Sequence, residues 1–478
     1  MKHIIDFNFR NISEDSHLMD LESQEESSIA KEINDSSKNT RVKKIFIPAT
    51  GTLGDVKPFM ILAEELKKRG HIVWLGVHRR YQDIVKAAGF DVVEIGGDLE
   101  HFLSTSPEGI ELRRNPSILK MGLVKRIFQP AIEEWFNGIL SGVKDADLIV
   151  LTVASIFPGL SCIEKFPNIK AIGIYTFPVI RTVHFSPPGL GGKSGSLFKW
   201  TNLLKWKIVD YAMSSIYNDK LNELRATNDL PPMKLNYERM TQSLFRKPLV
   251  SATIYSKYLI PCPSDWHEND HMVGPILEKE NENFQPPTPI LDFLTKWKNE
   301  KIIYVGLGSM MGTMFGADEQ MEFIRKILLA LDRNNCKAVM SLVGFKSADA
   351  STLSTADNIF YLTHAIPHSW LFIYMSATIH HGGAGTTHAS LWYGLPTLVL
   401  SFGADQPFNG DRIFINRLGP RSISIRHTNV KNLTNAIRDL MIDNYNIYKT
   451  SAKKISELIK NEDGLSHCVR LIEAELAE

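Results

Sequence analysis

The residues of this chain best suited to chemistry lie in one short stretch, His380-His381-Gly382-Gly383-Ala384-Gly385-Thr386-Thr387. An apolar segment, 376–380, precedes it and predicts a strand, and a helix is expected to begin near Ala384. The unpaired backbone N–H groups at such a helix start favour an anion. Glycines let a phosphate approach the backbone, Thr386 and Thr387 carry hydroxyl donors, and His381 can add a donor or a partial positive charge.

A second polar pair, Asp405-Gln406, follows the next apolar strand, 395–402. A carboxylate accepts hydrogen bonds and an amide both donates and accepts them, so the pair suits sugar hydroxyls. A diphosphate corner beside a hydroxyl clamp predicts a nucleotide-sugar site. The alternative is that Gly-Gly-x-Gly is only a tight strand-to-helix turn. Other phosphate loops fit poorly, because the chain has no G-x-x-x-x-G-K-[ST] and Gly383-Ala384-Gly385 lacks the third glycine of a dinucleotide fingerprint.

The elements that would position these residues alternate between strand and helix from Arg41 onward, and this alternation predicts parallel sheets with helices on both faces. The expected strands are 44–49, 71–77, 91–95, 147–153, 170–175, 301–307, 337–343, 358–362, 377–380, 395–400 and 422–425, with helices at 58–69 and 118–140 among those between them. We therefore expect an α/β fold of two doubly wound Rossmann-like domains that face a cleft, where ligands bind in such folds.

The expected domain bounds follow from changes in composition. Residues 1–40 are polar and acidic and predict a disordered tail. The Pro-rich segment 284–289 predicts a linker, after which the strand–helix pattern restarts. We thus expect an N-terminal domain over 41–283, a linker over 284–300, and a C-terminal domain over 301–478 that ends in closing helices.

Composition excludes several classes of protein. Of the 478 residues 44% are hydrophobic and 22% charged, and the net charge is +1, so no nucleic-acid partner is expected. The cysteines are scattered without a C-x-x-C pair, which indicates a reducing compartment and no zinc site. No apolar run reaches the ~18 residues that span a bilayer, and no signal-peptide pattern begins the chain, so we expect a cytoplasmic protein. The D-x-D at Asp145 and Asp147 is interpreted as a structural loop, and no metal is expected.

Several further motifs carry a resemblance to a known family. They are the loop Gly51-Thr52-Leu53-Gly54-Asp55-Val56-Lys57-Pro58, the strand-loop Tyr304-Val305-Gly306-Leu307-Gly308-Ser309, and the turn Ile366-Pro367-His368-Ser369-Trp370-Leu371-Phe372. Together with the glycine corner and Asp405-Gln406, they make residues 43–440 resemble the UDP-sugar-dependent glycosyltransferases of the GT-B fold, and within them the sterol 3β-glucosyltransferases. The resemblance implies inverting transfer of glucose from UDP-glucose to a lipophilic alcohol, above all the sterol 3β-hydroxyl, with no cofactor besides the donor substrate.

The same resemblance implies roles for matching positions. Thr52, Leu53 and Asp55 would face the cleft; Ile366 and His368 would flank the nucleobase; His381, Ala384, Gly385 and Thr386 would hold the diphosphate, with Ser309 as a further contact; Asp405 and Gln406 would bind the hexose. One departure stands out, because the related loop usually reads Gly-Ser-Arg-Gly-Asp and Leu53 replaces its arginine here. A cation is therefore missing, and its function is either absent or supplied elsewhere.

Asp55 is the candidate general base that takes the proton of the acceptor hydroxyl, an effect of about 10²–10⁴-fold. The alternative is that Asp55 is only a helix N-cap before Pro58, a proline position that suits the first turn. Both roles can hold together. The helix start at Ala384 and His381 would stabilise the departing UDP without a metal.

The acceptor side resembles that of sterol glucosyltransferases at 176–182 and 187–192. The helix that follows carries apolar residues interleaved with lysines, namely Phe198, Trp200, Leu203, Leu204 and Trp206 with Lys199, Lys205 and Lys207. Such a helix either rests on a membrane surface, where a sterol resides, or packs on its own domain with its lysines in water. His364, His388 and His427 are expected to have core or surface roles.

Three other functions remain open. The first is a glucosyltransferase for a soluble aglycone such as a polyketide or a phenolic, which a polar, closed acceptor pocket would favour. The second is a nonenzymatic nucleotide-sugar binder, which would predict loss of Asp55 or of the Asp405-Gln406 pair, and both are present. The third is an epimerase, which would change the sugar without any acceptor.

Overall fold

The structure is a computed structural model that describes residues 42–114, 121–190, 199–233, 249–279, 284–345, 353 and 357–478. The expected tail, the expected start of a helix at Ile118, and Gly191, Gly192 and Phe198 lie outside the described residues. Residues 44–478 form one compact unit, and every helix and strand of the described chain belongs to it.

The first half of this unit is built on a parallel sheet with the strand order β3-β2-β1-β4-β5-β6-β7 among the described residues. Its strands are β1 (Lys44–Pro48), β2 (Ile72–Val77), β3 (Asp91–Glu94), β4 (Leu148–Leu151), β5 (Lys170–Tyr175), β6 (Ser251–Thr253) and β7 (Asp270–Met272). Ile45 pairs with Val73 on one side and with Leu148 on the other. The order of the strands therefore reverses between β1 and β4, and a ligand site is expected at their carboxyl ends.

The second half repeats this arrangement with the order β10-β9-β8-β11-β12-β13. Its strands are β8 (Ile302–Gly306), β9 (Lys337–Ser341), β10 (Ile359–Leu362), β11 (Ala377–His380), β12 (Thr397–Ser401) and β13 (Ile423–Ser424). Thr378 pairs with Tyr304 and with Thr397, so this sheet reverses between β8 and β11. The two sheets confirm the predicted α/β fold of two Rossmann-like domains.

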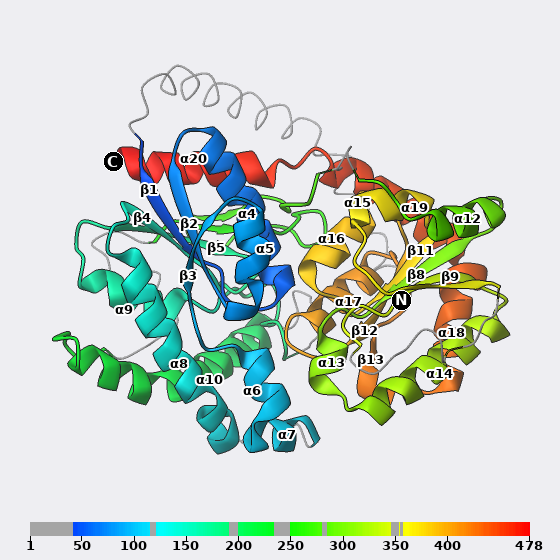
Figure 1. Ribbon diagram of the computed structural model, residues 1–478, viewed down its shortest axis with the longest axis horizontal. Helices are drawn as coiled ribbons and strands as arrows, with labels where there is room; N and C mark the ends of the chain where they lie inside the picture. Colours follow the sequence, from blue (N-terminus) through cyan, green and yellow to red (C-terminus); the bar gives the residue numbers. More distant parts are fainter. Residues whose placement is uncertain are drawn as a thin grey trace. The chain divides into compact units, whose positions relative to one another are not determined.

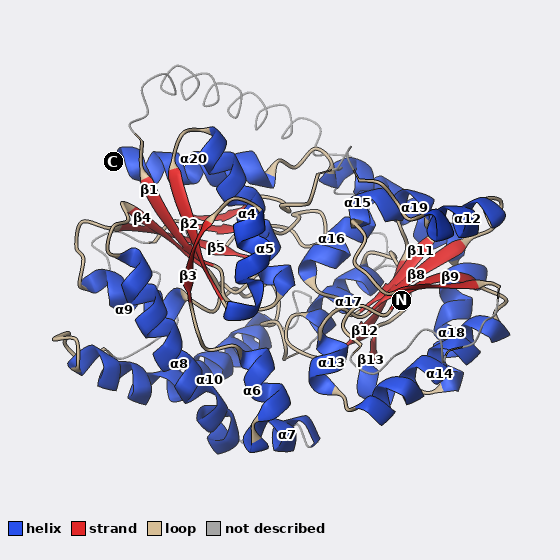
Figure 2. Ribbon diagram, in the orientation of Figure 1, coloured by secondary structure: helices blue, strands red, loops and turns tan. Residues whose placement is uncertain are grey.

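Helices cover the faces of both sheets, as Figure 2 shows. Those of the first half are α4 (Leu53–Lys68), α5 (Gln82–Ala87), α6 (Leu99–Thr105), α7 (Pro107–Arg114), α8 (Met121–Val143), α9 (Ile156–Glu164) and α10 (Lys199–Ala226). They are followed by α12 (Thr288–Lys296), α13 (Met310–Met314), α14 (Ala317–Arg333), α15 (His368–Leu371), α16 (Ala384–Trp392), α17 (Gln406–Ile415), α18 (Val430–Arg438), α19 (Tyr445–Ile459) and α20 (Gly464–Ala477).

Alternating side chains of the central strands fill two cores, one on each face of a sheet. Phe46 packs with Trp135 and Ile149, whereas Ile45 and Ile47 pack on the other face. Successive strand residues point to opposite faces, and here both directions are buried, which is why these strands are continuously apolar. Such strands hold the loops at their carboxyl ends rigidly.

The segment expected as a linker is shorter than the sequence suggested. Helix α12 begins at Thr288, with Pro287 as its N-cap and Pro289 in its first turn, where proline is tolerated. Ile290 and Phe293 are buried in the core of the second half. Of the expected linker, residues 284–287 precede the helix and have no regular secondary structure, whereas the apolar face of α12 is anchored in the core.

The last helix packs on the first half, although it follows the second half in sequence. Cys468, Val469 and Ile472 of α20 are fully buried in the core that contains Ile45 and Leu62. Figure 1 shows α20 close to α4, and α20 contacts both α4 and β5. The expected bounds at 41–283, 284–300 and 301–478 stay a prediction, but by its packing α20 completes the N-terminal core.

Candidate active site

Asp55 lies in the first turn of α4, directly after the loop that follows β1, at the point where the first sheet reverses. Its Oδ2 accepts hydrogen bonds from the backbone N–H of Thr52 at 2.8 Å and from the Thr52 hydroxyl at 2.9 Å. Gly51 has a φ of +123°, and a Cβ at this position would lie 2.6 Å from the same carboxylate oxygen. Glycine is therefore required for the carboxylate to take this position.

Helix α4 begins earlier than the sequence suggested, at Leu53 instead of Pro58, and Thr52 is its N-cap. Asp55 is the third helical residue, so it stabilises the helix start from within the first turn instead of as the N-cap itself. Pro58 lies inside the helix and cannot donate to the carbonyl of Gly54, but Gly54 is exposed and water can serve it. The capping role is thus observed in altered form, and the role as a base stays a prediction.

His78, which the sequence did not single out, holds this loop in place. Its Nε2 accepts the N–H of Gly51 at 3.1 Å, and its Nδ1 lies 3.0 Å from the carbonyl oxygens of both Ile95 and Gly96. These partners assign the proton to Nδ1. Burial lowers the pKa of His78, which keeps the ring neutral and its Nε2 available as an acceptor.

Asp55 faces a small, mostly apolar pocket at the carboxyl ends of β1, β4 and β5. The pocket has a volume of about 180 Å³ and is lined by Thr50, Gly51, Asp55, Phe59, Thr152, Val153, Ala154, Ile174, Thr176 and Phe177. Burial raises the pKa of Asp55, the hydrogen bonds from Thr52 lower it, and the charge of Glu100 raises it further. A carboxylate with a raised pKa is a stronger base than a solvated one.

The glycine corner is formed by β11 and the start of α16, as predicted. Gly382 has a φ of +92°, its N–H donates to Nδ1 of His380 at 2.9 Å, and Gly383 is the N-cap of α16. A Cβ at position 383 would lie 2.6 Å from Nε2 of His381, so only glycine fits beside this ring. Ala384, Gly385 and Thr386 form the first turn of α16, where backbone N–H groups lack helical partners.

One expectation for this corner is wrong, and of the two alternatives for His381 only the donor is kept. The hydroxyl of Thr387 is not available to a ligand, because the residue is buried and its Oγ1 donates back to the carbonyl of Gly383 at 2.9 Å. Burial lowers the pKa of His381 to about 4, so the ring is neutral at physiological pH and carries no positive charge. His381 still has one ring N–H that can donate.

Asp405 and Gln406 begin α17, after the end of β12. Ala404 has a φ of +53°, which is uncommon for a residue with a side chain and orients the adjacent carboxyl. Oδ2 of Asp405 accepts a hydrogen bond from Nδ2 of Asn409 at 2.9 Å. Gln406 is buried and its Oε1 accepts the N–H of Phe402 at 2.7 Å, so its carbonyl is already engaged.

Asp405 also brings the two halves of the site together. Burial, followed by the charge of Asp55, raises the pKa of its carboxyl to about 7, although hydrogen bonds, among them one from the backbone of Ala384, act to lower it. Asp405 therefore lies within electrostatic range of the candidate base and next to the start of α16. Asp55, Ala384 and Asp405, which were predicted from separate motifs, therefore lie close to one another.

His368 is the first residue of α15, Ile366 lies just before that helix, and η6 (Phe372–Tyr374) follows it. The ring of His368 stacks on Phe372 with centroids 4.4 Å apart, and Ile366 is partly buried. Burial, followed by smaller contributions from Lys57 and His381, lowers the pKa of His368 to about 4. His368 thus lies within electrostatic range of the glycine corner, as a nucleobase contact next to a diphosphate site would.

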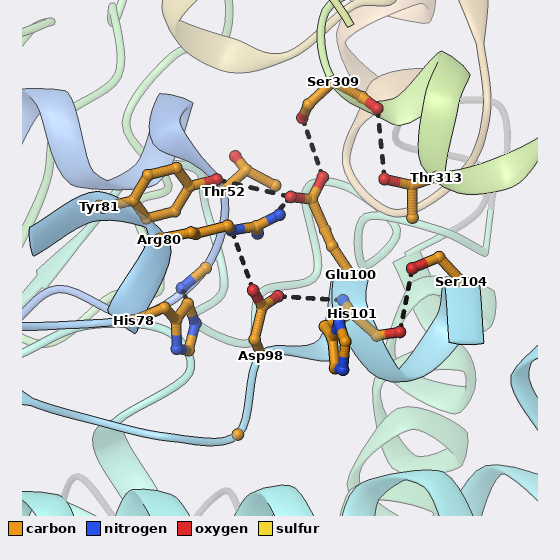
Figure 3. A network of polar contacts seen from close by, with 12 residues as sticks. Thr52, His78, Arg80, Tyr81, Asp98, Glu100, His101, Ser104, Ser309 and Thr313 are labelled. Atoms are coloured by element: carbon orange, nitrogen blue, oxygen red, sulfur yellow. Dashed lines mark hydrogen bonds and ion pairs between the residues drawn. The ribbon is translucent and has the colours of Figure 1, made fainter. Parts of the chain in front are cut away.

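Ser309 follows β8 and is the N-cap of α13. Gly308 has a φ of +64°, and a Cβ there would lie 3.3 Å from the ring of His381. The Ser309 hydroxyl donates to Oε1 of Glu100 at 2.9 Å (Figure 3). This contact joins the two halves, and no sequence pattern predicts it because the two residues are 209 positions apart.

Leu53 stands at the position of the family arginine and carries no charge, but two cations lie nearby. Lys57 is within electrostatic range of His368, and it forms an ion pair with Glu278 at 3.6 Å. Arg80 forms ion pairs with Asp98 and Glu100 (Figure 3). Tyr81, next to Arg80, contacts the backbone of Leu53 through its hydroxyl.

A second group missed by sequence reasoning supports the glycine corner from behind. Asn409 is fully buried, and its Nδ2 donates to the carbonyl of Gly382 at 2.7 Å as well as to Asp405. The hydroxyl of Tyr255 donates to Oδ1 of Asn409 at 2.9 Å. Nε2 of His388 accepts the N–H of Ser256 at 3.1 Å, and its Nδ1 lies 2.8 Å from the carbonyl of Ala384. The core role expected of His388 is thus a link between the segment after β6 and the corner.

Two other features of the described chain bear on the expectations. Oδ2 of Asp147 accepts the N–H of Lys44 at 2.7 Å, which is the structural use expected for this loop. Within the described residues, no group of three His, Cys, Asp or Glu side chains is arranged to hold a metal ion. The helices in the described part of the chain all fall short of the length and apolarity that crossing a membrane requires.

The fold and the site define a class of protein, and comparison with family models agrees with it. Residues 45–150 match the glycosyltransferase family 28 N-terminal domain, and residues 335–462 match the erythromycin biosynthesis protein CIII-like C-terminal domain. The chain is a glycosyltransferase of the GT-B fold.

The chain is also similar to individual proteins. A sterol 3-beta-glucosyltransferase of Arabidopsis thaliana is 28% identical over 89% of this chain, and one of Komagataella phaffii is 26% identical over 97%. The chain spans 64% of the length of the plant protein and 38% of that of the yeast protein. Among solved structures, the calicheamicin glycosyltransferase CalG4 has a TM-score of 0.64 at 18% identity, with 92% of this chain and 99% of that chain covered.

Proposed function

We propose that this protein transfers glucose from UDP-glucose to the 3β-hydroxyl of a sterol, with inversion at the anomeric carbon. The observation that carries the proposal is the position of Asp55. It lines an apolar pocket on one side, and on the other it lies within electrostatic range of Asp405 beside the glycine corner. The similarity to sterol 3-beta-glucosyltransferases supports this acceptor class.

In this proposal each half of the site has one task. The first turn of α16, with Ala384, Gly385 and Thr386, binds the diphosphate, while His381 donates through one ring N–H and Ser309 through its hydroxyl. Ile366 and His368 flank the uracil, and Asp405 and Gln406 bind the hexose hydroxyls. Thr52 and Leu53 form the wall opposite the donor.

The chemical step follows from these positions. The acceptor oxygen attacks the anomeric carbon, its proton passes to Asp55, and the bond between the anomeric carbon and the phosphate oxygen breaks. UDP leaves with the negative charge, which the N–H groups at the start of α16 stabilise. Because Asp55 must be ionised to accept the proton, transfer should decline as the pH falls below its raised pKa.

The volume of the pocket limits how the acceptor enters. Ligand pockets that enclose a drug-sized molecule measure roughly 300–1,000 Å³, whereas the space beside Asp55 is about 180 Å³. We infer that only the end of the sterol that carries the hydroxyl enters this pocket, and that the rest of the molecule lies outside it. A flat, fully polar aglycone would gain little from Phe59, Val153 and Phe177.

A membrane contact would supply such an acceptor. Along α10, Trp200, Leu204, Ile208 and Tyr211 are 69%, 51%, 48% and 77% exposed, and their spacing places them on one stripe of the helix. Trp206, in contrast, is buried and its Nε1 donates to the carbonyl of Phe185 at 3.0 Å. Exposed Lys199 and Lys207 accompany the stripe, as on helices that lie at an anionic membrane surface. We therefore propose a cytoplasmic enzyme that contacts membranes peripherally.

One experiment tests the proposal. Purified protein is incubated with UDP-glucose and vesicles that contain cholesterol or ergosterol, products are identified by mass spectrometry, and bound protein is measured by sedimentation of the vesicles. We expect a steryl hexoside from the wild type, a rate at least 10²-fold lower for Asp55→Asn, and unchanged binding of UDP to that variant. Asn keeps the size of the side chain and an acceptor for Thr52, so a loss of rate reports the missing base.

Each arm has an outcome that contradicts its part of the proposal. Full activity of Asp55→Asn would exclude Asp55 as the base. Transfer to a flavonoid but not to either sterol would change the acceptor to a soluble aglycone. Transfer to a detergent-dissolved sterol without sedimentation on vesicles would keep the acceptor and exclude the membrane contact.

A further inference from the structure

Glu100 is a buried carboxylate that spans the two halves of the site. It is 7% exposed, its Oε1 accepts the hydroxyl of Ser309 at 2.9 Å, and its Oε2 pairs with Nη2 of Arg80. Figure 3 shows the side chain of Glu100 extending from α6 toward Ser309, with the guanidinium of Arg80 alongside. Helix α6 also contacts α13, which begins directly after Ser309.

The charges around Glu100 do not balance. Arg80 is shared, because its Nε lies 2.9 Å from Oδ2 of Asp98 while its Nη2 pairs with Glu100. One guanidinium thus faces two carboxylates, and the group as a whole carries a net negative charge. The hydroxyl of Tyr81, at 3.5 Å from Oε2 of Glu100, adds only a weak contact.

Ser309 is the point where this group meets the proposed donor site. Its neighbour Gly308 packs against the ring of His381, which begins the glycine corner. A serine hydroxyl has one proton to donate, and a carboxylate oxygen and a phosphate oxygen accept it equally well. Glu100 therefore accepts the same hydroxyl proton of Ser309 that a phosphate at this corner would accept.

We propose that Glu100 accepts the hydrogen bond of the Ser309 hydroxyl in place of a phosphate of the sugar donor, and that the incoming diphosphate displaces the Glu100 carboxylate. Glu100 is then a positioning residue that sets the affinity for the sugar donor. This inference rests on the donor half of the proposed function. When the carboxylate moves away from the negative diphosphate, Arg80 loses one of its two acidic partners. Arg80 then supplies the cation that Leu53, in place of an arginine, does not.

Glu100 has a second effect on the same site, through Asp55. The charged or titratable groups that act on Asp55 in the described structure are Glu100, His78 and Asp405. The negative charge of Glu100 raises the pKa of Asp55. Removal of that charge should lower the pKa of the base and move the acid limb of the pH profile to lower pH. A residue that only packs would produce no such shift.

The test is the binding of UDP to the full-length protein by calorimetry, which does not depend on any acceptor. Glu100→Gln keeps the shape of the side chain and an oxygen that can accept from Ser309, but removes the charge. We expect UDP to bind this variant roughly three- to tenfold more tightly than the wild type. In a Ser309→Ala background most of this gain should disappear, because the contested hydroxyl is gone.

Glu134→Gln is the matched control. Glu134 lines the same cavity of about 950 Å³ as Glu100 and Ser309, but its Oε2 accepts the N–H of Gly97 at 2.5 Å. We expect its UDP affinity to stay within about twofold of the wild type. An equal gain in both variants would mean that any negative charge in the cavity matters, and would overturn the specific role of Glu100.

The remaining outcomes separate this inference from the proposed function. Equal or weaker UDP binding by Glu100→Gln, with no shift of the acid limb of kcat/KM, would overturn the inference and leave the glycosyltransferase intact. Failure of the wild type to bind UDP at all would overturn the donor assignment itself, and the inference with it.

Discussion

The carboxyl of Asp405 has a charge state that depends on the fold. Burial, followed by the charge of Asp55, raises its pKa to about 7. The native state therefore holds a proton on Asp405 between the ordinary pKa of an aspartate and about pH 7, and loses it as the pH rises through that value. Any stability that comes from this proton is present at lower pH and is lost as the pH rises through about 7.

This residue sets a pH dependence of donor binding. In the proposed function, UDP-glucose brings a negative diphosphate to the start of α16, next to Asp405, so binding would be favoured when Asp405 is neutral. We expect the affinity for UDP-glucose to fall as the pH rises through about 7, and the Asp405→Asn variant to show a flatter profile, both measured by calorimetry. A variant that retained the wild-type slope would assign the dependence to another group, with Asp55→Asn as the comparison.

At the scale of elements, the sequence predicted much of the frame. Residues 170–175 are a strand with the expected bounds, and the glycine corner lies between β11 and α16 as its apolar strand and helix start indicated. Parallel strands buried on both faces are continuously apolar and so are visible without any partner. Prolines misled the interpretation twice, because Pro58 lies inside α4, beyond its first turn, and Pro289 lies in the first turn of α12, where proline is tolerated.

The contacts that hold the site could not be predicted in the same way. His78 binds Gly51 across 27 positions, and Tyr255 binds Asn409 across 154. Periodicity reports which way a side chain faces, and a glycine pattern reports local backbone geometry, but neither names a partner on another element. For the same reason the neutral state of His381 was missed, since it follows from burial by distant residues.

The link between Tyr255 and Asn409 gives a prediction about how elements support the corner. Tyr255→Phe removes the hydrogen bond to Oδ1 of Asn409, which is fully buried, so an acceptor is left without its donor. We expect a loss of about 1–3 kcal/mol in the free energy of unfolding, and weaker UDP binding, because Asn409 also holds Gly382 and Asp405. Urea denaturation and calorimetry measure the two effects.

Tyr361→Phe is the control for this substitution. The hydroxyl of Tyr361 is buried and has no hydrogen-bond partner among the described residues, so its removal should be close to neutral. If both variants lost the same stability, the cost would come from the hydroxyl in general instead of from the link to Asn409. If Tyr255→Phe lost stability but kept wild-type UDP affinity, the link would stabilise the fold without positioning the donor site.

At the scale of the whole unit, the chain closes on itself through α20. This helix follows the second half, but its apolar face completes the core of the first. Polar contacts reinforce the packing, because Arg69 pairs with Glu473 at 3.1 Å and Nζ of Lys170 donates to the carbonyl of Glu475 at 2.7 Å. Loss of packing on α20 should therefore loosen the sheet that carries Asp55. Because Asp55 lies ~400 positions earlier in the chain, this coupling can only be tertiary.

Ile472→Ala tests this coupling. Ile472 is fully buried, and truncation of such a side chain typically costs about 2–5 kcal/mol through lost burial and the cavity left behind. We expect faster hydrogen exchange in α4 and β5, which α20 contacts, while β8, β11 and β12 keep their protection. Ile447→Ala on α19, where the isoleucine is 51% exposed, should leave both halves unchanged. Exchange that rose in the second sheet instead, or in α20 alone, would mean that the last helix is not part of the N-terminal core and that the first half holds the loop of Asp55 by itself.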